Sequence, residues 1–249
     1  MRERGFSLIE VLVVTAVFIV VSGAVFMLLN VSQQRYKMES EFLDSFQGAR
    51  LGLDQIIRDV HTTGYPPVAS LPAAISGASP NLVAFPFSWA PNYPTTPCGV
   101  PGCTIPAAFD MIMESDLDPE NANGVEWIRY RLNRTTLERG VATKTVGGNP
   151  LTATAAVMVP FVEDVMNNAG AGMMTRIRNS YSTMFPSNTP VPLFQYLCGV
   201  PAVACNASHM PNDIREVNVT LIVAAPNPDP KTGQIRVVTL TGLARRINP

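Results

Sequence analysis

The sequence is short of charge, of histidine and of basic clusters. Only 15% of its 249 residues are charged, 18 are basic against 19 acidic, and 2 are histidine. Soluble domains usually carry about 25% charged residues. Broad electrostatic capture of nucleic acid needs a basic surface and is not indicated. The sequence also lacks a nucleophile elbow, a glycine-rich phosphate loop and a metal-spaced histidine pair. We therefore predict a protein that is not an enzyme.

The longest uncharged segment lies near the N-terminus, from Val11 to Val31. Its roughly 21 residues, at about 1.5 Å rise each, cover the ~30 Å hydrocarbon core of a bilayer. Arg2 and Arg4 precede this segment and orient the N-terminus toward the cytoplasm. The pattern predicts a single transmembrane helix, with the following chain on the side of the membrane opposite the cytoplasm.

Glu10 interrupts the apolar run that begins at Phe6. A carboxylate near or inside lipid costs a few kcal/mol unless it has a partner or reaches the headgroups. Glu10 is therefore the candidate functional residue of this segment.

The segment GFSLIEVLVV resembles the precursor motif of the type IV pilins and of the pseudopilins of type II secretion. That motif has a short basic leader ending in glycine, then phenylalanine, then an apolar helix with glutamate at its fifth residue. Gly5, Phe6 and Glu10 match it. The resemblance implies that a prepilin peptidase cuts between Gly5 and Phe6, that Phe6 is N-methylated, and that the helix assembles into a filament. It also implies that the protein lies in the bacterial inner membrane with its head in the periplasm before assembly, and in the pilus or pseudopilus afterwards. Glu10 would then pair with the Phe6 ammonium of a neighbouring subunit, an attraction that is strong in a low-dielectric core.

Helical periodicity continues beyond the membrane segment. Apolar residues recur at gaps of three and four between Phe42 and Val60, with charged residues at other positions. Pro66 and Pro67 cannot continue a helix, so the helix should end near Gly64. The predicted organisation follows from these limits: a leader at 1–5, a helix over 6–64 that spans the membrane at about 6–31, and a globular head over 65–249.

The head carries strand patterns. Residues alternate between an apolar and a mixed face in VEWIRYRL, and Pro160 places its own strand at a sheet edge. The expected strands are Val125–Leu132, Thr136–Val141, Val157–Val165, Val217–Ala224 and Ile235–Leu243, with a short one near Leu82–Phe87. Residues 65–106 and 167–216 read as irregular excursions. One long helix followed by antiparallel strands predicts an α+β fold.

The four cysteines form two close pairs in glycine- and proline-containing loops. Cys98 and Cys103 lie in CGVPGC, and Cys198 and Cys205 lie in CGVPAVAC. Export into an oxidising compartment favours two local disulfides, although four cysteines allow three connectivities. Zinc is the weaker interpretation, because the spacings are unusual and no histidine lies at ligand spacing.

An acidic segment offers oxygen ligands at Asp116, Asp118, Glu120 and Asn123. Calcium binds six to eight such oxygens on a flexible loop. The twelfth position of an EF-hand loop would hold a bidentate glutamate, and Trp127 stands there instead. We favour a solvated acidic turn and no firm metal site, with calcium as the alternative cofactor.

Four arginines lie along the predicted hairpin, at Arg129, Arg131, Arg134 and Arg139. We expect a solvated strand face here, and contact with an anion or with DNA is the alternative.

Further segments resemble the W-type minor pilins (PilW) and the J-type pseudopilins. They are IIRDVHTTGY, EWIRYRLNRTTLERG and TLTGLARRINP, and the residues near the subgroup positions include Asp59, Gly64, Arg139, Arg246 and Asn248. This resemblance implies a minor type IV pilin that primes pilus assembly at or near the filament tip. Its partners would be other pilins, the prepilin peptidase and the inner-membrane assembly platform. The alternatives are a minor pseudopilin of a type II secretion system, or a pilus-tip adhesin or DNA-uptake component.

Overall fold

The computed structural model describes residues 7–70, 80–87, 106–120, 124–168, 177, 180–186, 189–206, 209, 211–229 and 232–248. The chain divides into two compact units, Met1–Leu43 and Asp44–Pro249. The second unit contains the last part of the long helix together with all the strands.

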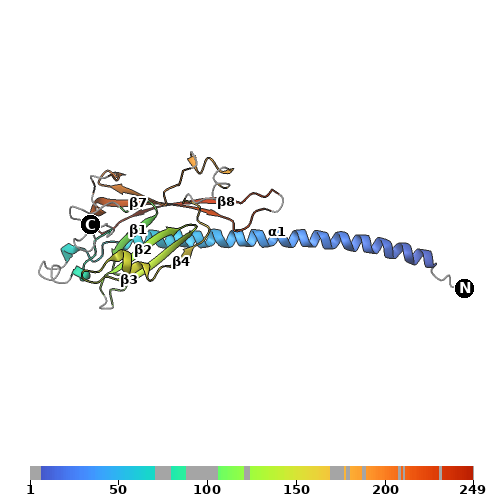
Figure 1. Cartoon of the computed structure of the whole chain (residues 1–249), viewed down its shortest axis with the longest axis horizontal. Coiled ribbons are helices and arrows are strands. Elements are labelled where there is room, and N and C mark those ends of the chain that lie inside the picture. The colour runs from blue at the N-terminus through green and yellow to red at the C-terminus, as the bar shows by residue number, and fades with distance from the viewer. Residues whose placement is uncertain are drawn as a thin grey trace. The chain divides into compact units, whose positions relative to one another are not determined.

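Helix α1 runs from Leu8 to Thr62 (Figure 1). Its first turn is closed by the backbone N–H groups of Glu10 and Val11, which donate to the Ser7 carbonyl at 3.0 and 3.2 Å. By length and composition this helix can cross a membrane, with a mean hydropathy of 2.8 in its most apolar window. The predicted long helix is confirmed.

Within the second unit, one stripe of α1 is buried. Ala49, Leu53, Ile56 and Val60 are between 0% and 6% exposed. Their spacing of four, three and four residues places them on one face of a helix. The apolar stripe predicted from the sequence is thus the face that packs into the core.

The end of α1 is fixed by Gly64, which adopts a left-handed conformation with φ of 81°. Glycine takes this conformation without steric cost. The Gly64 N–H donates to the Glu114 carbonyl at 2.8 Å, which ties the helix end to the first sheet. The predicted stop near Gly64 is confirmed.

The first sheet is antiparallel, with order β1-β2-β3-β4. Its strands are β1 Asp110–Ser115, β2 Glu126–Asn133, β3 Thr136–Thr143 and β4 Val159–Val162. Arg134 turns the β2–β3 hairpin with φ of 56°. A short helix α3, Pro150–Ala155, connects β3 to β4, and the Asn149 side chain caps its first turn. The edge position predicted for the strand that contains Pro160 is confirmed.

The second sheet is also antiparallel, with order β6-β5-β7-β8. Its strands are β5 Phe194–Cys198, β6 Val203–Ala204, β7 Ile214–Ala224 and β8 Val237–Arg245. Strands β7 and β8 pair over nine positions, from Glu216↔Arg245 to Ala224↔Val237. Single 3-10 turns lie at η1 Val68–Ser70, η2 Pro80–Leu82 and η4 Pro211–Asp213.

The main core joins the buried stripe of α1 to both sheets. Strand β8 approaches the helix at Gly242, where an added Cβ would lie 2.7 Å from Ile57 Cδ1 and 3.2 Å from Leu53 Cδ1. A second, smaller cluster covers part of the β7 surface with Met166, Ile177 and Phe185. Helix, two sheets and a shared core make this an α+β, pilin-like layout.

Three expectations need correction. The region near Leu82–Phe87 holds η2 and isolated bridges instead of a strand, because its backbone pairs at single points with separate segments. Both faces of β2 are largely buried instead of one: Ile128 and Tyr130 are 0% exposed on the apolar face, and on the other face Trp127 is 0% and Arg129 6% exposed. The excursion at 167–216 contains β5 and β6, whose short pattern lacks clear alternation.

Candidate functional site

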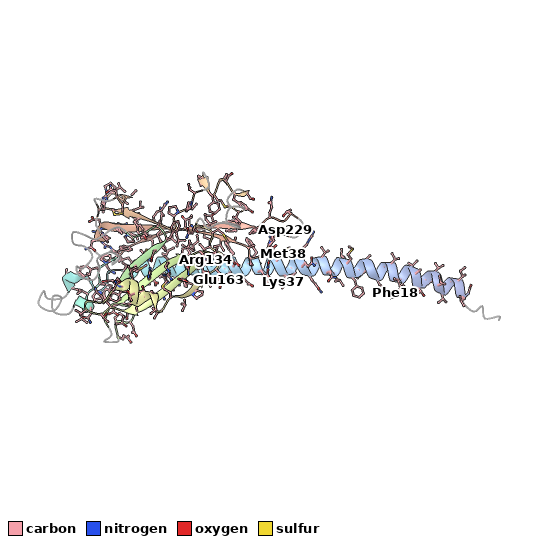
Figure 2. The ribbon with its side chains drawn as sticks, viewed as in Figure 1. Phe18, Lys37, Met38, Arg134, Glu163 and Asp229 are labelled. Atoms are coloured by element: carbon pink, nitrogen blue, oxygen red, sulfur yellow. A yellow bond between two sulfur atoms is a disulfide. The ribbon has the colours of Figure 1, made fainter. Side chains whose placement is uncertain are left out.

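The candidate site is the N-terminal part of α1. Its apolar side chains are exposed along the first unit: Leu8 is 84%, Leu12 62% and Met27 73% exposed. Figure 2 labels Phe18, which projects from the helix and is 68% exposed. Such a continuous apolar surface is stable only in lipid or against other helices.

Glu10 lies in the first turn of this helix and is exposed. The N-terminal end of a helix favours a negative side chain, because the free N–H groups carry partial positive charge. The carboxylate can therefore meet a cation supplied from outside its own helix. Gly5 and Phe6, the predicted cleavage residues, lie outside the described residues.

The comparison with protein families falls on this segment. Residues 1–26 match the family described as the prokaryotic N-terminal methylation motif. This match supports a type IV pilin-like or pseudopilin-like protein. The matched motif includes Gly5, Phe6 and Glu10, so it confirms the resemblance at the level of the superfamily. Comparisons with curated proteins and with solved structures gave no significant match.

The motif carries consequences for this pilin-like protein. It implies processing by a prepilin peptidase and a place in filament assembly, which is a structural role. Together with the exposed apolar helix, it fits a protein anchored in a membrane.

The pilin head is attached to its own helix segment by a buried polar network. Asp59, on α1 and 4% exposed at its side chain, accepts from the Tyr130 hydroxyl at 2.6 Å and from Arg139 Nη2 at 2.9 Å. Gln55 Nε2 donates to the other carboxylate oxygen at 2.7 Å. Burial, and then the Asp59 charge, raise the pKa of Tyr130. Burial alone would lower the pKa of Arg139, but Tyr130 and Asp59 outweigh it and raise that pKa.

A second buried network surrounds Glu114 on β1, which is 0% exposed. Its carboxylate accepts from Lys144 Nζ at 2.6 Å, from Trp127 Nε1 at 2.9 Å and from the Phe85 N–H at 2.8 Å. Lys144 also donates to the Val83 carbonyl at 3.0 Å. The charge is thus fully hydrogen-bonded, as a buried carboxylate requires.

The predicted solvated arginine face is largely wrong. Arg129 makes a bidentate pair with Asp110 at 2.8 and 2.6 Å, and its side chain is 7% exposed. Arg131 pairs with Glu138 at 2.7 Å, and Arg139 pairs with Asp59. Carboxylates from β1, β3 and α1 pair with these side chains and shield them partly or fully from solvent, and alternation within one strand does not reveal such partners.

Glu138, the partner of Arg131, lies in an environment that favours its charged carboxylate. Burial raises the pKa of Glu138, but hydrogen bonds from Asn133 and Arg131 outweigh it and lower that pKa.

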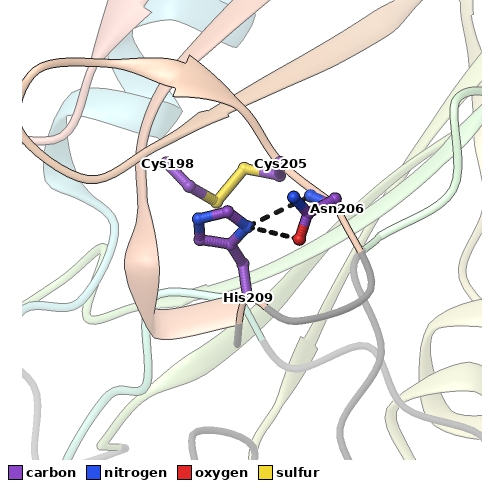
Figure 3. Close-up of a disulfide and its surroundings, with 4 residues drawn as sticks. All are labelled: Cys198, Cys205, Asn206 and His209. Carbon is purple, nitrogen blue, oxygen red and sulfur yellow. Dashed lines mark hydrogen bonds between the residues drawn. A yellow bond between two sulfur atoms is a disulfide. The ribbon is translucent and has the colours of Figure 1, made fainter.

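The disulfide between Cys198 and Cys205 is present, with a Cα–Cα distance of 5.1 Å. It closes the loop between β5 and β6, and this local pairing agrees with the prediction. Figure 3 shows His209 beside the disulfide, where its Nδ1 accepts from the Asn206 N–H at 3.2 Å. Cys98 and Cys103 lie outside the described residues.

The acidic segment forms a hydrogen-bonded turn. The Asp118 N–H donates to Asp116 Oδ1 at 3.1 Å, and the Leu117 N–H donates to Glu126 at 2.9 Å. Burial raises the pKa of Glu126, with a further contribution from Asp116 and Asp118. No group of three or more potential metal-binding His, Cys, Asp or Glu residues occurs in the described part of the chain. Asn123 lies outside that part, and calcium binding stays the untested alternative to the solvated turn.

A surface hollow of about 260 Å³ lies between α1 and β4 within the second unit. Asp44, Glu163 and Asp164 contribute three carboxylates to its lining. Burial raises the pKa of Asp164, and the neighbouring Glu163 charge raises it further. The hollow is smaller and more acidic than the mostly apolar pockets of about 300–1,000 Å³ that hold small ligands.

Proposed function

We propose that this chain is a minor type IV pilin that primes pilus assembly and occupies a position at or near the filament tip. The size and build of the second unit carry this proposal. Residues 44–249 form two four-stranded sheets with long connections. A subunit in the body of a helical filament is enclosed by neighbours, whereas a subunit at the tip has a free side where a large head fits.

The proposed assembly step uses the two charges at the start of α1. Cleavage after Gly5 creates an ammonium on Phe6, and Glu10 of an adjacent subunit pairs with it. At about 4 Å such a pair is worth ~1 kcal/mol in water but ~4 kcal/mol at the effective dielectric constant of a protein surface. The exposed position of Glu10 leaves its carboxylate accessible to another chain.

Before assembly, α1 would hold the subunit in the inner membrane with its head in the periplasm. Other pilins, the prepilin peptidase and the assembly platform would then be its partners. The leader charges support this orientation, because arginines are retained on the cytoplasmic side.

Two substitutions test the assembly mechanism. Gly5→Ala should leave the uncut precursor on a gel, because a side chain would obstruct the peptidase. Glu10→Gln should be processed normally but should enter sheared filaments at least several-fold less. Glu41→Gln is the matched control, since Glu41 pairs with Lys37 on its own helix at 3.8 Å. Equal incorporation of Glu10→Gln and the control would refute the ion-pair role.

A deletion strain tests the placement. A priming tip subunit should be present at about one copy per filament, and its deletion should abolish most surface pili. Even labelling along the filaments would refute the tip position. Normal pili with a loss of protein secretion would favour the pseudopilin instead.

A further inference from the structure

Arg246 directly follows β8 and is only 6% exposed. Its Nε and Nη1 atoms are buried and have no hydrogen-bond partner in the part of the chain that the structure describes. Buried guanidinium groups are normally paired, because an unpaired one loses its hydration without compensation. The buried charges of Asp59, Glu114, Arg129 and Lys144 all have an ionic partner. Arg246 therefore stands out within this head.

A second arginine lies directly across from Arg246. The Arg246 N–H donates to the Arg215 carbonyl at 2.9 Å, next to the Glu216↔Arg245 pair of β7 and β8. Residues at opposed antiparallel positions share one face, with Cβ atoms about 4.5–5.5 Å apart, and like charges there are destabilising. Burial, and then the Arg215 charge, lower the pKa of Arg246 to about 10. Arg246 thus stays cationic at neutral pH, and no anion among the described residues is hydrogen-bonded to its Nε or Nη1.

The carboxylate of Asp213 only partly offsets the two cationic charges. The Asp213 charge acts on Arg246 in the favourable direction, but it is outweighed by burial and by Arg215. Asp213 is exposed and does not bond to Nε or Nη1 of Arg246. Arg246 and Arg215 consequently repel each other, and a bound negative group would lower the electrostatic free energy of both side chains.

We propose that Arg246 and Arg215 form a binding site for an oxyanion, a carboxylate or a phosphate. A guanidinium presents its N–H groups as a planar fork that matches two oxygens of such a group. One bound oxyanion would satisfy the free Arg246 donors and remove the repulsion between the two arginines.

The site adjoins the end of α1. The Ile247 N–H donates to the His61 carbonyl at 3.4 Å, and Asn248 Nδ2 donates to the Thr62 carbonyl at 3.1 Å. The residues directly after Arg246 thus bind the last turn of the helix. Occupancy of the site would therefore stabilise the junction between β8 and α1.

The test is thermal unfolding of the full chain in a non-ionic detergent, with inorganic phosphate compared with chloride at equal ionic strength. Phosphate should raise the midpoint of the wild-type protein, and the rise should saturate because binding is to one site. Arg246→Leu should raise the midpoint in chloride, since it removes an unpaired buried charge, and should abolish the phosphate response. Arg215→Gln should weaken the phosphate response without removing Arg246.

Arg245→Gln is the matched control. Arg245 is adjacent in sequence but 74% exposed at its side chain and lies 4.0 Å from Glu216. It should leave the phosphate response unchanged. The structural alternative is that Arg246 only stabilises the C-terminal end of α1, where the helix dipole is negative. In that case Arg246→Leu lowers the midpoint in chloride and phosphate shifts no variant, which would overturn the proposal.

Sedimentation of the detergent-solubilised chain distinguishes the two sources of the oxyanion. A carboxylate of a second subunit predicts association with rising protein concentration, which phosphate and Arg246→Leu both reverse. A free phosphate predicts a constant mass with the saturable thermal shift retained. Both results support the site. A constant mass together with no thermal shift would overturn it.

Discussion

Removal of the Arg139 charge offers the sharpest test of how the pilin head holds its helix. Arg139→Met keeps the aliphatic stem but leaves the Asp59 carboxylate, 4% exposed, without its cation. Asp59 would retain only the Tyr130 hydroxyl and the Gln55 amide, at 2.6 and 2.7 Å. We therefore expect a large loss of stability in the unit that contains residues 44–249.

The size of the loss follows from burial. Removing one partner of a fully buried ion pair lowers the free energy of unfolding by about 3–5 kcal/mol. The Arg139 side chain is 22% exposed, so water partly replaces it, and we expect about 2–4 kcal/mol. For a unit of this size each kcal/mol corresponds to roughly 2–4 °C in the unfolding midpoint. The midpoint should therefore fall by about 4–16 °C.

The assays are urea unfolding, which gives the free energy, and thermal unfolding, which gives the midpoint temperature. Both use the full chain in detergent and follow the fluorescence of buried Trp127. Arg131→Met is the matched control, because Arg131 lies on the same hairpin and its ion pair with Glu138 is more exposed, at 34% and 15%. The control should lose no more than about 1 kcal/mol. Asp59→Asn combined with Arg139→Met should recover part of the loss, since no charge is then stranded. Equal losses in Arg139→Met and Arg131→Met would refute the reasoning.

Three further perturbations have expected outcomes. Lys144→Met should lower the free energy of unfolding in urea by about 3–5 kcal/mol, because it leaves the fully buried Glu114 carboxylate without its cation. A loss below about 1 kcal/mol would contradict this. Gly242→Val should cost about 1–3 kcal/mol, because its Cβ would lie 2.7 Å from a helix side chain, and an unchanged midpoint would argue against that contact. Cys198→Ser with Cys205→Ser should cost about 2.5 kcal/mol by loop-closure entropy and should expose the β5–β6 loop to protease; unchanged stability and cleavage would count against a constraining disulfide.

Local sequence patterns were sufficient for the elements that depend on neighbours along the chain. The uncharged run from Val11 to Val31 predicted the helix, and the motif at residues 1–26 supports the superfamily. Pro66 and Pro67 limited the helix, and Gly64 ends it with a positive φ. Pro160 correctly placed its strand at an edge, because proline cannot donate to a ladder on both sides.

Some parts of the fold had too weak a local signal to predict. Strand β1 is short and carries the half-buried Asp110 and the buried Glu114, so its polarity resembles that of a loop. Strand β6 has only two residues and exists because the Cys198–Cys205 loop returns beside β5. In both cases the strand forms because it pairs with another strand, and the local sequence does not predict that pairing.

The sequence by itself determined the membrane-compatible helix, its processing motif and its end, because these rest on contiguous residues with fixed periodicity. Only the tertiary structure decided which charged side chains are buried and which residues they pair with. Asp59 and Arg139 are 80 residues apart, and their pairing exists only once α1 packs against the β2–β3 hairpin. The fold also leaves Arg246 buried after β8, with no partner for Nε or Nη1 among the described residues, and no period in the sequence encodes that position. Burial and long-range pairing set the electrostatic free energy of each charge, and both are properties of the folded chain.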